Sequence, residues 1–146
     1  MHMNHCLYLV DAELIVEAAM VMAQTRSARV SIALVDAAGQ LMTFRRLDGS
    51  SVASVETSIA KARTASLTGV DSAKAEQAIA SGRIALLSLQ GVLHQPCALM
   101  AGGLVLMCQG EVVGAIGVSG MTPDQDVAVA QAGLEAFEIR VLGCSS

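Results

Sequence analysis

The sequence has almost no aromatic residues: its 146 residues include one tyrosine, two phenylalanines and no tryptophan. It also lacks a basic stripe, because its nine lysines and arginines are scattered and the formal net charge is −4. Proteins that bind nucleic acid need clustered positive charge for the phosphates or aromatic rings on which the bases stack. The composition therefore argues against nucleic acid as a partner.

Long apolar runs are missing as well. The longest apolar stretches, such as residues 84–89 and 99–108, are broken by polar residues or glycines. They are well short of the roughly 20 residues that span a bilayer. Residues 1–6 contain neither the basic region nor the apolar region of a secretion signal. We therefore expect no membrane insertion and a cytoplasmic location.

The four cysteines show no metal-binding or redox spacing. Cys6, Cys97, Cys108 and Cys144 are far apart, and none belongs to a C-x-x-C pair. We expect reduced thiols, two of them acting as small core residues, in a cytoplasmic protein. The N-terminus also carries a loose histidine and cysteine cluster (His2, His5 and Cys6). An unstructured terminus seldom binds a metal, so no metal site is predicted.

The chain is rich in apolar residues, which make up 53% of it, whereas charged residues make up only 15%. A small soluble monomer must cover a large surface relative to its volume with polar groups. The composition therefore predicts that some faces contact other copies of the chain. The length is that of one domain. We expect a single domain over residues 11–146, preceded by an extension over residues 1–10.

The spacing of apolar residues predicts helices and strands in alternating groups. A first helix follows Asp11 as its N-cap, and its wide apolar stripe (Leu14, Ile15, Ala18, Ala19, Val21 and Met22) predicts burial on more than one side. The other predicted helices cover residues 51–67, 71–81 and 123–142, and the predicted strands cover residues 30–35, 41–46, 98–100, 104–108 and 112–119. Residues 82–94 fit either a buried helix end or a strand.

Turn residues support this division. Gly39 is expected to supply the positive φ of a hairpin turn between the first two strands, and Gly69 to end the second helix. Strands linked by hairpins and flanked by helices imply a mainly antiparallel sheet with helices packed on it. The sequence therefore predicts an α+β fold.

The junction between the last strand and the last helix, residues 114–126, carries the strongest local signal. Thr122 suits the N-cap and Gln125 the reciprocal arm of a capping box. Three glycines in the segment (Gly114, Gly117 and Gly120) allow close approach, either by a ligand or by a helix packed over the strand. The N–H groups at the helix start favour an anion such as a carboxylate. Both interpretations, an anion site and a packing device, remain open.

Lys61 and Thr64 share one face of the second helix, near its apolar side. The lysine is a candidate anchor for a ligand carboxylate, or a base if burial lowers its pKa. A structural ion pair with Asp48 or Asp126 is the simpler alternative.

Two further residues are candidates for ligand binding. Arg46 stands just before Asp48 and either holds the turn there or binds an anion. His94, the only histidine away from the N-terminus, is either a ligand to a metal cofactor, a general acid or base, or an ordinary loop residue.

Several motifs, in order, resemble one known family. They are residues 35–39 (VDAAG), 46–49 (RLDG), 61–65 (KARTA), 102–103 (GG) and 110–120 (GEVVGAIGVSG), followed by Asp126. Their order and spacing are similar to those of the GlcG/HbpS-like family, which is described as haem-degrading or haem-binding. A related domain accompanies a corrinoid adenosyltransferase, and other members lie in gene clusters for catabolism. The resemblance covers roughly residues 12–142.

This resemblance implies a profilin-like or PAS-like fold, with a five-stranded antiparallel sheet between helical layers. It also implies homo-oligomers, from dimers to octamers. By motif position, the implied pocket residues are Arg46, Asp48, Lys61, Thr64, Gly102, Gly103, Gly117, Ser119, Gly120 and Asp126. Residues 66–70 (SLTGV) and 104–106 (LVL) depart from the family pattern and imply a reshaped pocket mouth.

Two functions follow from these residues. The first is a homo-oligomeric protein that binds a small anionic ligand, with haem as a possible cofactor, methionines in the apolar lining and His94 or a thiol on the iron. The second is a cofactor-free isomerase, tautomerase or hydratase-like lyase acting on a small carboxylate. In that enzyme Lys61 is the base, and Asp126 or Asp48 is its proton partner. The N–H groups of Ser119 and Gly120 would then stabilise an enolate.

Overall fold

A computed structural model describes residues 7–144 of the chain. Its elements, in order, are α1 (Leu9–Thr25), β1 (Ser31–Asp36), β2 (Leu41–Arg46), α2 (Val52–Thr68), α3 (Ser72–Ala80), the 3-10 helix η1 (Ile84–Ser88), α4 (Leu89–Leu93), β3 (Gly103–Cys108), β4 (Glu111–Ser119) and α5 (Pro123–Cys144). The division into an extension and a domain stays a prediction, although α1 already begins at Leu9.

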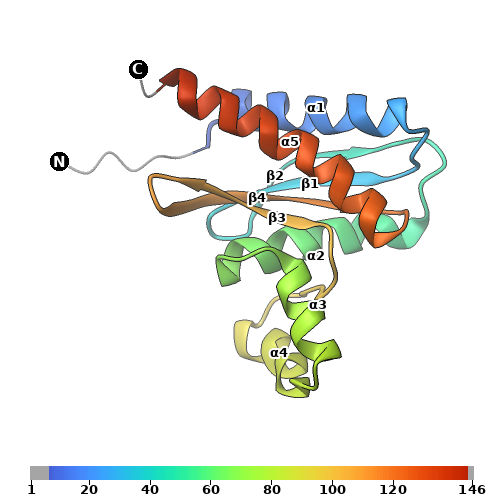
Figure 1. The fold of residues 1–146 in the computed structure, drawn as a ribbon, viewed down its shortest axis with the longest axis vertical. Coiled ribbons are helices and arrows are strands. Elements are labelled where there is room, and N and C mark those ends of the chain that lie inside the picture. The colour runs from blue at the N-terminus through green and yellow to red at the C-terminus, as the bar shows by residue number, and fades with distance from the viewer. Residues whose placement is uncertain (1–6, 145–146) are drawn as a thin grey trace.

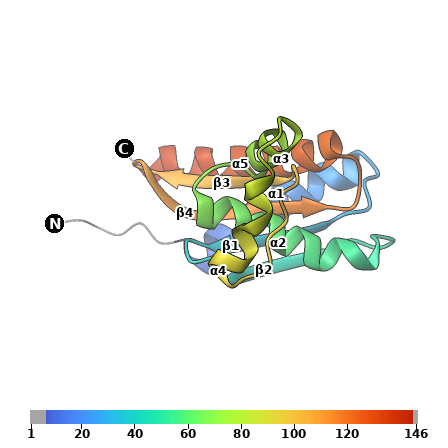
Figure 2. The same cartoon turned by 90° about the horizontal axis from the view of Figure 1, so that it is seen from below.

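The strands form one antiparallel sheet in the order β2-β1-β4-β3. Helices α1 and α5 cover one face of this sheet and α2 covers the other (Figures 1 and 2). Helices α3 and α4 extend away from the sheet on the α2 side (Figure 1). The α+β class and the antiparallel sheet between helical layers are therefore confirmed.

The fifth strand, predicted over residues 98–100, does not form. Its backbone groups bind side chains instead of a neighbouring strand: the Ala98 N–H donates to Thr64 Oγ1 at 2.9 Å, and the Met100 carbonyl accepts from the Ser72 hydroxyl. Within the described residues the sheet therefore has four strands. A profilin-like or PAS-like assignment stays a prediction.

Helix α1 begins one turn earlier than predicted, with Tyr8 as its N-cap. Asp11 lies inside the helix, where its carboxylate accepts the Tyr8 N–H at 2.9 Å. The helix lies at the surface beside α5, so only one face is buried (Ala12, Ile15, Val16, Ala19 and Ala23). Leu14 and Val21 are 48% and 52% exposed, and the prediction that α1 is buried on more than one side is therefore wrong.

A polar contact fixes α1 to β2. The Glu13 carboxylate accepts hydrogen bonds from the Arg45 guanidinium and from the Thr43 hydroxyl. These bonds, that of Arg45 first, hold the pKa of Glu13 below its usual value. A lowered pKa means that the contact stabilises the fold at neutral pH and loses that contribution as the pH falls through the folded-state pKa.

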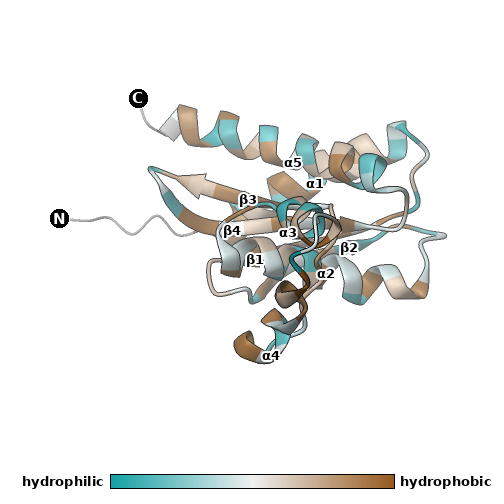
Figure 3. Cartoon of the chain, turned by 60° about the horizontal axis from the view of Figure 1, so that its bottom comes forward, coloured by the Kyte–Doolittle hydropathy of each residue, from teal (hydrophilic) through white to brown (hydrophobic). Residues whose placement is uncertain are grey.

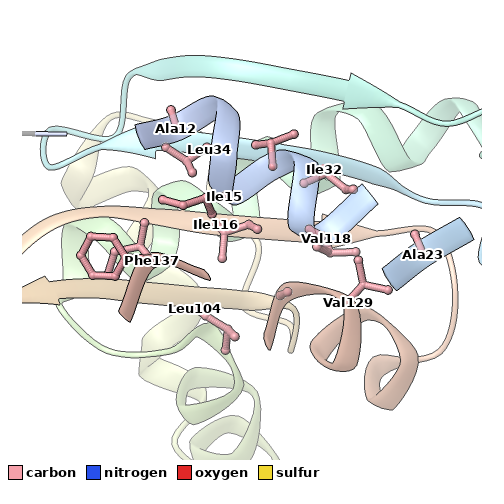
Figure 4. Packing of buried hydrophobic residues seen from close by; sticks show 14 of the residues in the cluster. Ala12, Ile15, Ala23, Ile32, Leu34, Leu104, Ile116, Val118, Val129 and Phe137 are labelled. Atoms are coloured by element: carbon pink, nitrogen blue, oxygen red, sulfur yellow. The ribbon is translucent and has the colours of Figure 1, made fainter. Parts of the chain in front are cut away.

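The main core lies between the sheet and helices α1 and α5. Its large members include Ile15, Leu34, Ile116 and Phe137, which point toward one another in Figure 4. The opposite face of the sheet packs against α2 through a smaller cluster of mostly small residues (Ala33, Val35, Ala62, Ala65 and Ala115). Small residues let α2 lie close to β4, and this close contact positions the candidate site.

Within residues 82–94, for which the sequence allows either a helix or a strand, residues 84–93 are helical. They contain η1 and α4, and neither helix has a buried residue. The strand alternative is therefore wrong, and so is the expectation that this segment is buried. Within residues 7–144, no helix combines the length and hydropathy needed to cross a bilayer.

A substitution at Gly117 can test the close packing of β4 against α2. A Cβ at this position would collide with the Ser58 carbonyl oxygen and lie 2.6 Å from the Ala62 nitrogen. We expect Gly117→Ala to lower the free energy of unfolding by about 1–3 kcal/mol, because backbone atoms must move. Urea unfolding followed by circular dichroism measures this change.

The matched control is Gly91→Ala in α4, where an added Cβ meets no atom within 4 Å. It should leave the stability unchanged or raise it by up to about 1 kcal/mol through helix propensity. Equal stabilities of the two variants would contradict the packing role of Gly117.

Candidate functional site

A buried ion pair lies at the end of β4. Lys61 comes from α2, and its Nζ lies 3.1 Å from Asp126 Oδ2 in the first turn of α5. The same ammonium donates to the Val118 carbonyl at 3.1 Å. The two side chains are 5% and 3% exposed. Because α2 and α5 lie on opposite faces of the sheet, this pair joins the two helical layers around the end of β4.

The sequence predicts either Asp48 or Asp126 as the acidic partner of Lys61, and the structure shows that Asp126 forms the ion pair. Asp48 is exposed in the turn between β2 and α2. A pair of residues 65 positions apart cannot be recognised from local spacing.

The start of α5 satisfies its own hydrogen-bond donors. Asp126 Oδ1 accepts the Met121 N–H at 3.0 Å. Thr122 and Gln125 form the predicted capping box, with bonds of 3.3 Å in both directions between backbone N–H and side-chain oxygen. Two carboxylates, Asp124 and Asp126, also stand in this first turn. The predicted anion would have to compete with these groups, and its binding here stays a prediction.

The glycine pair Gly102-Gly103 closes directly over the lysine. A Cβ at Gly102, where φ is +129°, would lie 2.9 Å from Lys61 Nζ. A Cβ at Gly103 would collide with the Lys61 carbonyl oxygen. The Gly103 N–H donates to Ser72 Oγ at 2.8 Å and so fixes the loop to α3. These glycines make room for protein atoms of the same chain.

The structure thus brings together seven of the predicted site residues. We call this region, around the end of β4 and between α2 and the strands β3 and β4, the seam; it contains Lys61, Thr64, Gly102, Gly103, Gly117, Ser119 and, paired with Lys61, Asp126. Thr64 Oγ1 donates to the Ala60 carbonyl at 2.8 Å and accepts the Ala98 N–H at 2.9 Å. No buried side-chain nitrogen or oxygen among the described residues lacks a partner. In this geometry the seam is a filled packing region whose polar atoms are satisfied internally.

The other predicted site residues lie outside the seam. The Arg46 side chain donates to Ser50, with Nε 3.3 Å from Oγ and Nη2 3.2 Å from the carbonyl oxygen, so it holds the turn before α2. Gly120 has φ +139° and its Cβ position is blocked by the Arg29 carbonyl. His94 is exposed at the C-cap of α4, with φ +56°. Ligand binding by each of them stays a prediction.

Metal and thiol chemistry has little support in residues 7–144. They contain no group of three or more histidine, cysteine or acidic residues that could hold a metal ion. The N-terminal cluster His2, His5 and Cys6 lies outside the described residues. Cys97 and Cys108 are free thiols, and Cys108 is buried in the core as expected of one of the cysteines.

An apolar groove on the outer surface was not predicted. It runs between α1 and α5 and is lined by Leu14, Ala136, Ile139, Arg140 and Gly143. The Arg140 guanidinium at this groove binds the Asp11 carboxylate. The apolar stripe of α1 does not predict the groove, because it places Leu14 in the core, whereas Leu14 is 48% exposed. The groove also exposes Ile139, an apolar residue near the end of α5 that is 72% exposed.

A family model described as "Haem degrading protein HbpS-like" matches residues 7–135. Among curated proteins, the chain is 32% identical over 108 residues to an uncharacterized 15.0 kDa protein in the dhaT-dhaS intergenic region of Citrobacter freundii. That alignment covers 74% of this chain and 75% of the relative.

Solved structures agree with the match. The crystal structure of protein ORFY from Klebsiella pneumoniae superposes with a TM-score of 0.85 at 28% identity, over 94% of each chain. The crystal structure of a PduOC–haem complex superposes with a TM-score of 0.82 at 27% identity, over 90% of this chain and 95% of that one.

The seam can be tested through its ion pair. Lys61→Met leaves the Asp126 carboxylate buried without its cation, and we expect a loss of about 3–5 kcal/mol of unfolding free energy. Asp126→Asn keeps an acceptor for the Met121 N–H but removes the charge. In the double variant no charge is buried, so its loss should be smaller than the sum of the single losses by about 0.5–3 kcal/mol. Additive losses in urea unfolding would show that the two side chains are not coupled.

Proposed function

Because this chain belongs to the HbpS-like family of haem-degrading proteins, we propose that it is a cytoplasmic homo-oligomer that binds a small anionic ligand, with haem as the first candidate. The observation that carries the proposal is the similarity to the PduOC–haem complex over 90% of the chain. The cytoplasm is proposed because Cys97 and Cys108 are free thiols, which persist in reducing surroundings.

Among the predicted ligand-binding residues, His94 fits haem best. Neutral imidazole is a common axial ligand of haem iron, and His94 is exposed. Aliphatic side chains of α4 precede it, among them Val92, which is 69% exposed. A porphyrin needs an apolar surface of this kind beside the axial ligand.

A cation lies near the same loop. Arg63 Nη1 is 3.5 Å from the carbonyl oxygen of Pro96, which follows His94 closely in the chain. A guanidinium there suits the propionates of haem or the carboxylate of another small ligand. The bound iron would supply the redox chemistry, while the protein residues supply the axial nitrogen, the apolar contact and the positive charge.

The other candidate regions fit haem less well. The seam has no space for a ligand, because protein atoms of the same chain lie where side chains of its glycines would stand. The groove between α1 and α5 contains no histidine, cysteine or methionine among its lining residues, and its Arg140 already binds Asp11. For these reasons the proposal uses the loop at His94.

The alternative proposal, a cofactor-free catabolic enzyme with Lys61 as base, finds no support in the geometry. A general base needs access to the proton that it removes. Lys61 is 4% exposed, and its amine binds both the Asp126 carboxylate and the Val118 carbonyl. Catalysis by this residue would require the seam to open.

Haem titration tests the proposed ligand and the proposed axial residue separately. Adding haem to the purified protein should shift the Soret band, and the shift should be saturable. His94→Ala should remove the shift or weaken binding at least tenfold, the loss of about 1.4 kcal/mol. The neighbouring Gln95→Ala variant is the matched control and should bind like the wild type.

Each contrary result has its own meaning. No Soret shift in the wild type would remove haem as the ligand. A normal shift in His94→Ala would remove only the assigned axial ligand. Native mass spectrometry of protein purified without added ligand reports both the assembly and any other small molecule retained.

A further inference from the structure

Residues 81–100 form a projection that we call the arm. It contains η1, α4 and the loop that leads back toward β3, and it extends away from the sheet (Figure 1). Within the chain, η1 packs against α3 and α4 packs against η1. No residue of the arm belongs to either of the two hydrophobic clusters. The main cores of the protomer therefore do not hold this segment.

The arm exposes large aliphatic side chains. Ile84 is 69% exposed, Leu87 is 66% exposed and Val92 is 69% exposed. Figure 3 shows the same segment as one of the most hydrophobic parts of the ribbon. From Ile84 to Gly110 the sequence has no aspartate, glutamate, lysine or arginine. Clustered apolar residues on a soluble protein mark a surface that another molecule covers.

The helices of the arm are too short to be stable by themselves. Each has 5 residues, and α4 carries Gly91 in its middle. Helices shorter than about 12–15 residues are marginal in water, and packing of an apolar face supplies most of their stability. Neither helix buries a residue within the protomer. The protomer alone therefore gives these two helices little stabilising contact.

We propose that the arm is the surface by which two copies of this chain pair through a two-fold axis; this inference rests on the homo-oligomer proposed above and names its contact. A two-fold contact places the same surface of both copies face to face. Arg83, at the base of the arm, is its one charged side chain, so pairing here avoids the repulsion between carboxylates that a chain of net charge −4 would meet elsewhere. The arm spans residues 81–100, a length at the lower end of the roughly 20–30 residues that each partner contributes to a standard interface.

The other apolar surface of the protomer fits this role less well. The groove between α1 and α5 contains the ion pair of Arg140 and Asp11. Glu135 and Glu138 are exposed on the same part of α5. Pairing this surface with itself would bring carboxylates of both copies together, which the arm avoids.

Analytical ultracentrifugation of the full chain without added ligand tests the inference. The wild type should sediment at a multiple of its 15.0 kDa chain mass. Ile84→Glu and Leu87→Glu each add a carboxylate to the arm of both copies, and each should give a smaller species or weaken pairing at least about tenfold. Val52→Glu is the matched control, because Val52 is an isolated exposed valine at the start of α2, 81% exposed.

The outcomes separate this inference from the proposal on which it rests. A monomeric wild type overturns both. An assembled wild type whose arm variants keep the same mass, with wild-type circular dichroism, overturns only the role of the arm. Equal loss of mass in Val52→Glu also overturns it. A monomeric wild type that sediments with phosphatidylcholine vesicles, unlike its arm variants, assigns the arm to a lipid surface instead.

Discussion

The buried ion pair between Lys61 and Asp126 joins the two helical layers at the end of β4. Removing a lysine and an aspartate from water costs several kcal/mol per ion unless each is fully paired. Here the carboxylate also accepts the Met121 N–H, and the ammonium also donates to the Val118 carbonyl. Because α2 and α5 lie on opposite faces of the sheet, the pair fastens both layers to one strand end. The glycines over it follow from the same constraint, since a side chain there would occupy the space of the lysine.

The internal hydrogen bonds of the seam make it a poor site for a ligand. A region whose polar atoms are all satisfied internally binds a ligand only by giving up those bonds. Among the described residues, side chains that are free to meet a ligand must therefore be sought outside the seam. The arm combines the exposed His94 with exposed aliphatic side chains. The seam joins the two helical layers, whereas the arm is the proposed site of both ligand recognition and contact with a second copy.

Local signals in the sequence predicted local structure well. The capping box of Thr122 and Gln125 and the positive φ of Gly39 depend only on neighbouring residues, and both are confirmed. The strand over residues 98–100 fails because distant side chains, Thr64 and Ser72, take its backbone groups. Likewise, an apolar stripe does not reveal which side a neighbouring helix covers, so Leu14 was wrongly assigned to the core. The partner of Lys61 could be narrowed to two acids but not chosen, because the choice depends on where α5 starts in space.

Hydrogen–deuterium exchange of the protein with and without haem, read by peptide, tests directly whether the arm or the seam binds the ligand. If His94 binds the iron, exchange should slow only in the arm, centred on peptides that contain His94, with no change in the peptides of the seam. Slower exchange in the peptides that contain Lys61 and Asp126, with an unchanged arm, would contradict this prediction and make the seam the ligand site.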